Sequence, residues 1–203
     1  MLDAMSELDT QATATLRHYL ASAFEALRWK LDGLGEHELR RPLVPTGTNL
    51  LGIAKHVALV SGEYFGEVFG RPSELGPVLD EEPNADMWAT ADEPAPYVLG
   101  LLATAAAEAD ACLAELPLDA PGFVPWWGPE TGKVTLFTVT VHVLAELNRH
   151  TGQADIVREL VDGAAGLNAR SSNLPGDEDG ADAQWWAAYR ARLEALAETF
   201  RNP

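Results

Sequence analysis

The sequence predicts an all-α fold, a four-helix bundle with a long crossover and an extra C-terminal helix. Apolar residues recur at helical spacing in four long segments, and no segment keeps a two-residue alternation, so strands are minor or absent. These segments are roughly 22 to 29 residues long, which suits the helices of a bundle. The first connection is short and the second is long, as in bundles that contain a crossover.

The first two helices have recognisable ends. We expect the first helix over residues 6–34, where glycines interrupt the apolar repeat. The second helix follows an N-cap at Thr48 or Asn49 and ends near Gly70. Residues 73–92 are acidic and rich in proline, and the length of this segment favours a crossover loop over a hairpin.

The remaining helices follow from the same signals. The third is expected over residues 93–116, with prolines in its first turn, and the fourth over 134–161, before an Asp-Gly pair. Between them, residues 117–132 form a loop whose two adjacent tryptophans indicate either a lid or a small satellite of the core. A polar linker over 166–181 precedes a last amphipathic helix over 182–200.

This organisation predicts a bundle over residues 1–165 and a linker with one helix over residues 166–203. The last helix carries Trp185 and Tyr189 four residues apart, on one apolar stripe. Exposed aromatic stripes of this kind are uncommon in monomers. We therefore expect the helix to pack on the bundle or on a second subunit.

The composition excludes several classes of partner. The 203 residues carry a net charge of −17, which argues against binding to nucleic acid or to anionic membranes. The single Cys112 excludes an internal disulfide and a thiolate-rich zinc site. The first ten residues hold three acids and no base, unlike a signal peptide, and no apolar stretch approaches the roughly 20 residues of a membrane span. We expect a soluble cytoplasmic protein.

One helical stripe carries the candidate chemistry. His142, Glu146 and His150 lie four residues apart inside an apolar run, so they share one inward face of the predicted fourth helix. Two imidazoles and a carboxylate on such a face are costly unless a partner satisfies them, and a divalent metal would do so. His56, in the apolar second helix, can complete a set of two histidines and one carboxylate. Such a set leaves a coordination position open, as in catalytic zinc and non-haem Fe(II) sites.

Each of these residues also has a simpler interpretation. A lone histidine such as His56 on an apolar helix is often a core residue bonded to a backbone carbonyl. Glu146 and His150 could form an ordinary hydrogen bond between neighbouring helical turns. His142 could be a further ligand, orient Glu146 without binding the metal itself, or be structural, and we favour the last two roles.

The stretch His142-Val-Leu-Ala-Glu146-Leu-Asn-Arg-His150-Thr-Gly-Gln153 resembles the fourth-helix motif of DinB-like metalloproteins. These proteins are four-helix bundles in which the second helix supplies one histidine and the fourth supplies two ligands four residues apart. The resemblance implies that His56, Glu146 and His150 hold the metal, with His142 and Gln153 adjoining the ligands. It covers roughly residues 8–163. Because DinB-like proteins are often dimers of bundles, the resemblance also implies a homodimer.

Many DinB-like relatives have histidine where this chain has Glu146. The His-Glu-His form is similar to the zinc-holding domain of mycothiol-dependent maleylpyruvate isomerase. That isomerase has a second domain after the bundle, whereas here a linker and one helix follow, so the resemblance implies the ligands more specifically than the reaction. The resemblance implies that the metal is Zn²⁺, with Ni²⁺ or Fe²⁺ as alternatives.

DinB-like relatives of known activity use low-molecular-weight thiols. The resemblance therefore implies a thiol-dependent transferase or isomerase in which the metal holds a thiolate, such as that of mycothiol, against a small-molecule substrate. The alternative is a non-catalytic, metal-stabilised binding or stress-response module, which a closed coordination sphere completed by His142 would favour. Hydrolysis by a metal-activated water ranks last, because the only general base available is Glu146, already used as a ligand.

Overall fold

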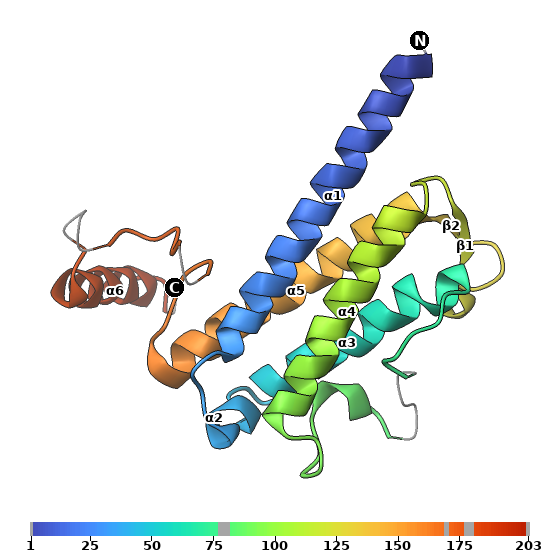
Figure 1. Ribbon diagram of the computed structural model, residues 1–203. Coiled ribbons are helices and arrows are strands. Elements are labelled where there is room, and N and C mark those ends of the chain that lie inside the picture. Colours follow the sequence, from blue (N-terminus) through green and yellow to red (C-terminus); the bar gives the residue numbers. More distant parts are fainter. Residues whose placement is uncertain (1, 77–81, 169–170, 177–180, 202–203) are drawn as a thin grey trace. The chain divides into compact units, whose positions relative to one another are not determined.

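The computed structural model describes residues 2–76, 82–168, 171–176 and 181–201, and the chain divides into two compact units, Met1–Ala165 and Gly166–Pro203. The first unit is built from four long helices, α1 (Leu2–Leu31), α3 (Leu50–Phe65), α4 (Ala95–Glu115) and α5 (Leu136–Asp162) (Figure 1). Its short elements are α2 (Glu36–Arg40), the 3-10 turns η1 (Glu67–Phe69), η2 (Ala85–Met87) and η3 (Pro125–Trp127), and the strands β1 (Pro121–Phe123) and β2 (Lys133–Thr135). The second unit contains α6 (Ala183–Glu198). The expectation of a mainly helical protein is confirmed.

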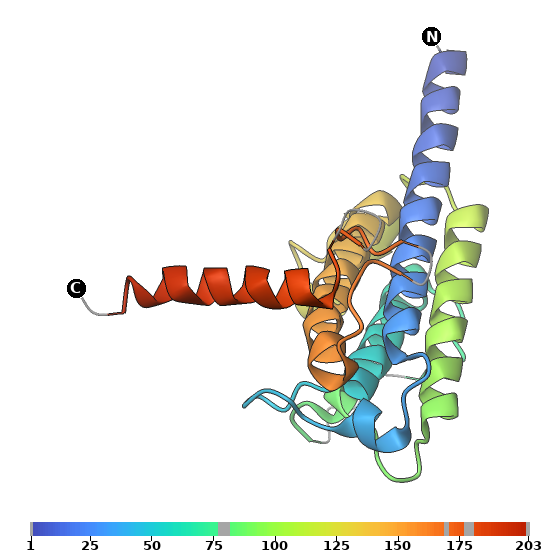
Figure 2. The same ribbon diagram turned by 90° about the vertical axis from the view of Figure 1, so that its left-hand side faces the viewer.

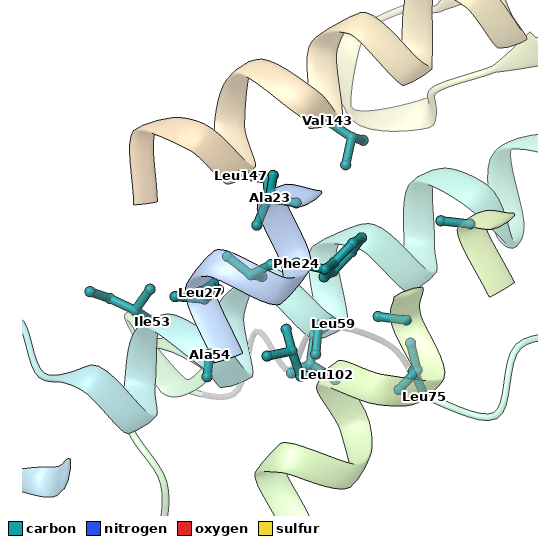
Figure 3. Close-up of a cluster of buried hydrophobic side chains, with 14 of the residues drawn as sticks. Ala23, Phe24, Leu27, Ile53, Ala54, Leu59, Leu75, Leu102, Val143 and Leu147 are labelled. Atoms are coloured by element: carbon teal, nitrogen blue, oxygen red, sulfur yellow. The ribbon is translucent and has the colours of Figure 1, made fainter. Parts of the chain in front are cut away.

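The four long helices share one core. α1 and α3 each pack against both α4 and α5, and in Figure 2 α1 lies between these two helices. Apolar side chains from all four meet in the middle, among them Leu27, Ile53, Leu102 and Leu147 (Figure 3). Each fully buried side chain of this size contributes about 1.5–3 kcal/mol. α3 is the most enclosed, with 13 of its 16 residues buried, so polar groups on α3 need partners from the surrounding segments.

Two of the expected helix caps are present, whereas α1 spans Leu2–Leu31 instead of the expected residues 6–34. Asn49 is the N-cap of α3, since its side-chain oxygen accepts the Gly52 N–H at 2.8 Å. α5 ends at Asp162, and its C-cap Gly163 has a φ of 80°, which suits glycine. α3 ends at Phe65 rather than near Gly70, because the chain tightens there into η1.

The segment between α4 and α5 contains a short hairpin that the sequence did not indicate. β1 and β2 pair antiparallel, with Pro121 opposite Thr135 and Phe123 opposite Lys133. Three residues are too few for an alternating pattern to stand out. Helix α5 accordingly begins at Leu136, two residues later than expected, with Thr135 as its N-cap.

The described residues contain one marginal candidate for a membrane span, α4, although the sequence predicts no apolar stretch of that length. By length and composition, α4 is the one helix among the described residues that could cross a membrane. The core helix of a soluble protein meets the same criteria, and α4 buries residues from Ala95 to Leu113 against α1 and α3.

In the second unit, Asp182 caps α6 by accepting the Trp185 N–H at 2.8 Å. The rings of Trp185 and Tyr189 stack at 5.1 Å and 6°, and none of the α6 residues is buried. Packing of this stripe on the bundle or on a second subunit stays a prediction. Parts of the expected crossover and linker, residues 77–81, 169–170 and 177–180, lie outside the described residues.

Candidate metal centre

Two helices bring the three predicted ligands together. His56 lies in the middle of α3, and Glu146 and His150 lie one turn apart on α5, which packs directly against α3. The ring centroids of His56 and His150 are 4.6 Å apart. The Nε2 atom of His150 lies 3.7 Å from a carboxylate oxygen of Glu146. The two imidazoles and the carboxylate therefore form one cluster.

Each imidazole is anchored through its Nδ1 atom. Nδ1 of His56 lies 2.5 Å from Oδ2 of Asp86, and Nδ1 of His150 lies 2.9 Å from Oε1 of Gln153. A carboxylate or amide oxygen is an acceptor, so in the neutral rings both Nδ1 atoms carry the hydrogen. This tautomer leaves the lone pair of each Nε2 available for another partner.

The surroundings of His150 favour its neutral form. His150 is 8% exposed. Burial lowers the pKa of its imidazole, and the neighbouring His56 lowers this pKa further. The hydrogen bond to Gln153 and the charge of Glu146 act in the opposite direction but do not outweigh burial. A neutral imidazole is the form that binds a metal.

The donor set suits a divalent metal in its chemistry. Metal-bound histidines almost always donate the second ring N–H to a carboxylate, carbonyl or water, and both histidines here already have such an acceptor. Within the ranges that the structure describes, no three His, Cys, Asp or Glu side chains lie close enough together to hold a metal ion without moving. The side chain of Glu146 is 43% exposed, so it has room to move toward the imidazoles.

His142 belongs to an aromatic cluster, which we define as Tyr64, Trp126, Trp127 and His142. The His142 ring lies 5.0 Å from that of Tyr64 and 4.8 Å from that of Trp127. Both indole N–H groups donate to the Tyr64 hydroxyl, at 3.3 Å from Trp126 and 3.1 Å from Trp127. The two tryptophans of η3 thus cover the end of the α3–α5 pair.

The ligand cluster and the aromatic cluster lie along the same pair of helices. His56 meets His150 at one end, and Tyr64 meets His142 at the other, so α3 and α5 are antiparallel here. On each helix the two positions are eight residues apart, which is about 12 Å along the axis. Glu146 lies midway on α5. The candidate site is therefore elongated, polar at one end and aromatic at the other.

Asp86 is the site residue that sequence reasoning missed. It lies in η2, inside the segment expected to be an irregular acidic crossover. Nothing in the sequence distinguishes it from the other acids of that segment. Gly52 in α3 was a signal that another segment packs closely on this helix, because a glycine inside a helix costs stability and can have a packing reason. It does not identify Asp86.

The single cysteine is not placed for catalysis. Cys112 is fully buried in α4, and burial raises the pKa of its thiol to about 11. A thiol with this pKa holds very little reactive thiolate at neutral pH. Any sulfur chemistry at the α3–α5 site therefore needs a thiol from outside the chain.

The family model described as mycothiol-S-transferase matches residues 15–163 of the chain. The matched range includes the three predicted ligands, Asp86 and the aromatic cluster. No curated protein matches the chain.

Proposed function

Because this chain belongs to the mycothiol-S-transferase family, within the DinB-like superfamily, we propose that it is a metal-dependent enzyme that transfers the sulfur of mycothiol to an electrophilic small molecule. The observation that carries the proposal is the contact between the His56 and His150 rings, whose centroids are 4.6 Å apart, with the Glu146 carboxylate 3.7 Å from Nε2 of His150. In this proposal the four long helices form the DinB-like four-helix bundle.

His56, Glu146 and His150 would hold the metal. Two imidazoles and one carboxylate suit Zn²⁺ best, with Ni²⁺ and Fe²⁺ as alternatives. When bound with an open position, such a metal deprotonates a coordinating thiol. Asp86 and Gln153 each accept the Nδ1–H of one histidine. The Nε2 lone pair of each ring is then free to bind the metal.

The thiol and the electrophile come from solution. Cys112 is buried, so the nucleophilic sulfur belongs to mycothiol rather than to the protein. That sulfur forms a bond to an electrophilic carbon, the leaving group departs with the electron pair of its bond, and the thiol proton passes to solvent. The aromatic cluster offers an apolar surface about two helical turns from His150, and Trp126 is 46% exposed. This surface favours an electrophile with an apolar or aromatic group.

The alternative, a binding module with a closed coordination sphere, requires His142 as a further ligand. His142 instead packs against Tyr64 and Trp127, which supports the enzymatic proposal.

Thiol-conjugation assays test the proposal. The zinc-loaded protein is incubated with an aromatic electrophile and either mycothiol, glutathione or cysteine, and loss of free thiol is followed. We expect conjugation with mycothiol, and loss of this activity in His150→Ala. His18→Ala, which removes an exposed histidine of α1, serves as the matched control and retains activity. A conjugation rate that His150→Ala leaves unchanged contradicts the proposal.

A further inference from the structure

We propose that Asp86 is a positioning residue, which holds the His56 ring in the tautomer and orientation that a metal ligand needs. The inference rests on the proposed function, and it adds a residue from the crossover to a site otherwise made by α3 and α5. Asp86 acts through His56, whose Nδ1 atom it contacts.

The contact between the two residues is short and sheltered. The Nδ1–Oδ2 distance is 2.5 Å, and the side chains are 21% exposed for His56 and 14% for Asp86. Hydrogen bonds to an ionised acceptor are about twice as strong as neutral ones, and shielding from water strengthens them further. The bond therefore constrains both the ring rotation and the tautomer of His56.

The segment that carries Asp86 is fastened to α3 by a buried lysine. Lys55, the residue before His56, is only 5% exposed, so its ammonium group needs nearby acceptors. It donates to the carbonyls of Ala85 and Trp88, at 3.3 and 3.1 Å, and to the carboxylate of Glu93 at 2.9 Å. Two of these acceptors lie within two residues of Asp86.

A glycine allows the same segment to lie directly on the helix. A Cβ atom at Gly52 would come within 1.8 Å of the Met87 carbonyl oxygen, so no larger residue fits without displacing η2. Asn49, one turn earlier, donates its side-chain amide to the same oxygen at 3.3 Å. Asn49 and Lys55 thus bind backbone carbonyls on both sides of Asp86, and Gly52 leaves room for η2 to lie this close to α3.

Asp86 also differs in charge from its counterpart Gln153. Both accept from an Nδ1 atom, but Gln153 is neutral, whereas Asp86 adds one negative charge beside the ligand cluster. Together with Glu146, an ionised Asp86 balances the two positive charges of a divalent ion. Charge balance and orientation are separate contributions, and two substitutions distinguish them.

The test compares Asp86→Ala, Asp86→Asn and a control, Asp92→Asn, which removes one charge from an exposed position nearby. Zinc affinity is measured by competition with a chromogenic chelator. We expect Asp86→Ala to lower the affinity about 10- to 100-fold, as is typical when a partner of a ligating histidine is removed. Asp86→Asn keeps a neutral acceptor and recovers part of this loss, and Asp92→Asn matches the wild type.

A second measurement needs no metal. Nitrogen-15 NMR of the metal-free protein reports which ring nitrogen of His56 carries the hydrogen. We expect Nδ1–H in the wild type and in Asp86→Asn, and a mixture of tautomers in Asp86→Ala. An unchanged tautomer in Asp86→Ala overturns the inference, and so does a zinc affinity within twofold of the wild type. If the wild type binds no zinc, the proposed function fails, and the NMR result alone decides the role of Asp86.

Discussion

Replacing Gly52 by alanine tests how the crossover positions the site without altering any polar group. The added Cβ would lie 1.8 Å from the oxygen and 2.5 Å from the carbon of the Met87 carbonyl. Ordinary van der Waals contact begins at 3.4 Å, so the carbonyl must retreat by about 1.6 Å, the difference between the two distances. Asp86 is the preceding residue, and a comparable shift would stretch its 2.5 Å bond to His56 beyond hydrogen-bonding range.

Two energies of opposite sign set the expected change in stability. Alanine stabilises a helix interior by about 0.5–1 kcal/mol relative to glycine. Overpacking against a fixed neighbour costs about 1–3 kcal/mol, so Gly52→Ala is expected to lower the free energy of unfolding overall. The zinc affinity should fall about as far as it does in Asp86→Ala, roughly 10- to 100-fold, because both changes release His56.

Gly100→Ala is the matched control for this prediction. Gly100 lies in α4, and a Cβ there meets no atom within 4 Å, so only the gain in helix propensity applies. Urea unfolding and chelator competition are measured on both variants. The reasoning is refuted if Gly52→Ala is stabilised as much as Gly100→Ala and binds zinc as tightly as the wild type.

Three further predictions concern the ligands, the cysteine and the acid stability. Elemental analysis should show that His150→Ala loses the metal and that His142→Ala keeps it. Glu146→Gln should weaken metal binding less than His150→Ala does, because an amide oxygen can still coordinate. Cys112 should not react with a thiol reagent at pH 8 until the protein is unfolded, because burial raises its pKa to about 11; rapid labelling of the folded protein would contradict its placement. Burial acts to raise the pKa of Glu93, but hydrogen bonds from a lysine and a backbone N–H outweigh it and lower the pKa below the usual 4.5. Its contribution to stability is therefore complete above about pH 4.5 and is lost as the pH falls through the lowered pKa, so Glu93→Gln should flatten the decline of the urea midpoint below about pH 4.5.

The long helices could be predicted because their signals are local. Apolar spacing and caps such as Asn49 and Gly163 depend on neighbouring residues, so helix type and approximate ends followed from the sequence. The hairpin could not be predicted in the same way, because strands of three residues carry no periodicity. Helix α4 has the length and composition of a membrane span, but a core helix meets the same criteria, so these criteria alone do not separate the two.

The candidate site likewise contains residues that local sequence signals predict and residues that depend on long-range folding. Glu146 and His150 are one helical turn apart, so spacing alone places them together, and His56 followed from its apolar surroundings and a family resemblance. Asp86 could not be foreseen, because its contact with His56 depends on how a crossover folds back over α3. The place of Trp127 beside His142 likewise depends on the hairpin that presents it.

The zinc content of His56→Ala tests the central claim most directly, because His56 is the one predicted ligand from α3. Wild-type protein and the control His18→Ala are purified, saturated with zinc, freed of excess metal and analysed by mass spectrometry for elements. A metal held between α3 and α5 predicts one zinc ion per chain in the wild type and the control, and almost none in His56→Ala. A His56→Ala protein with the full zinc content of the wild type would contradict the account.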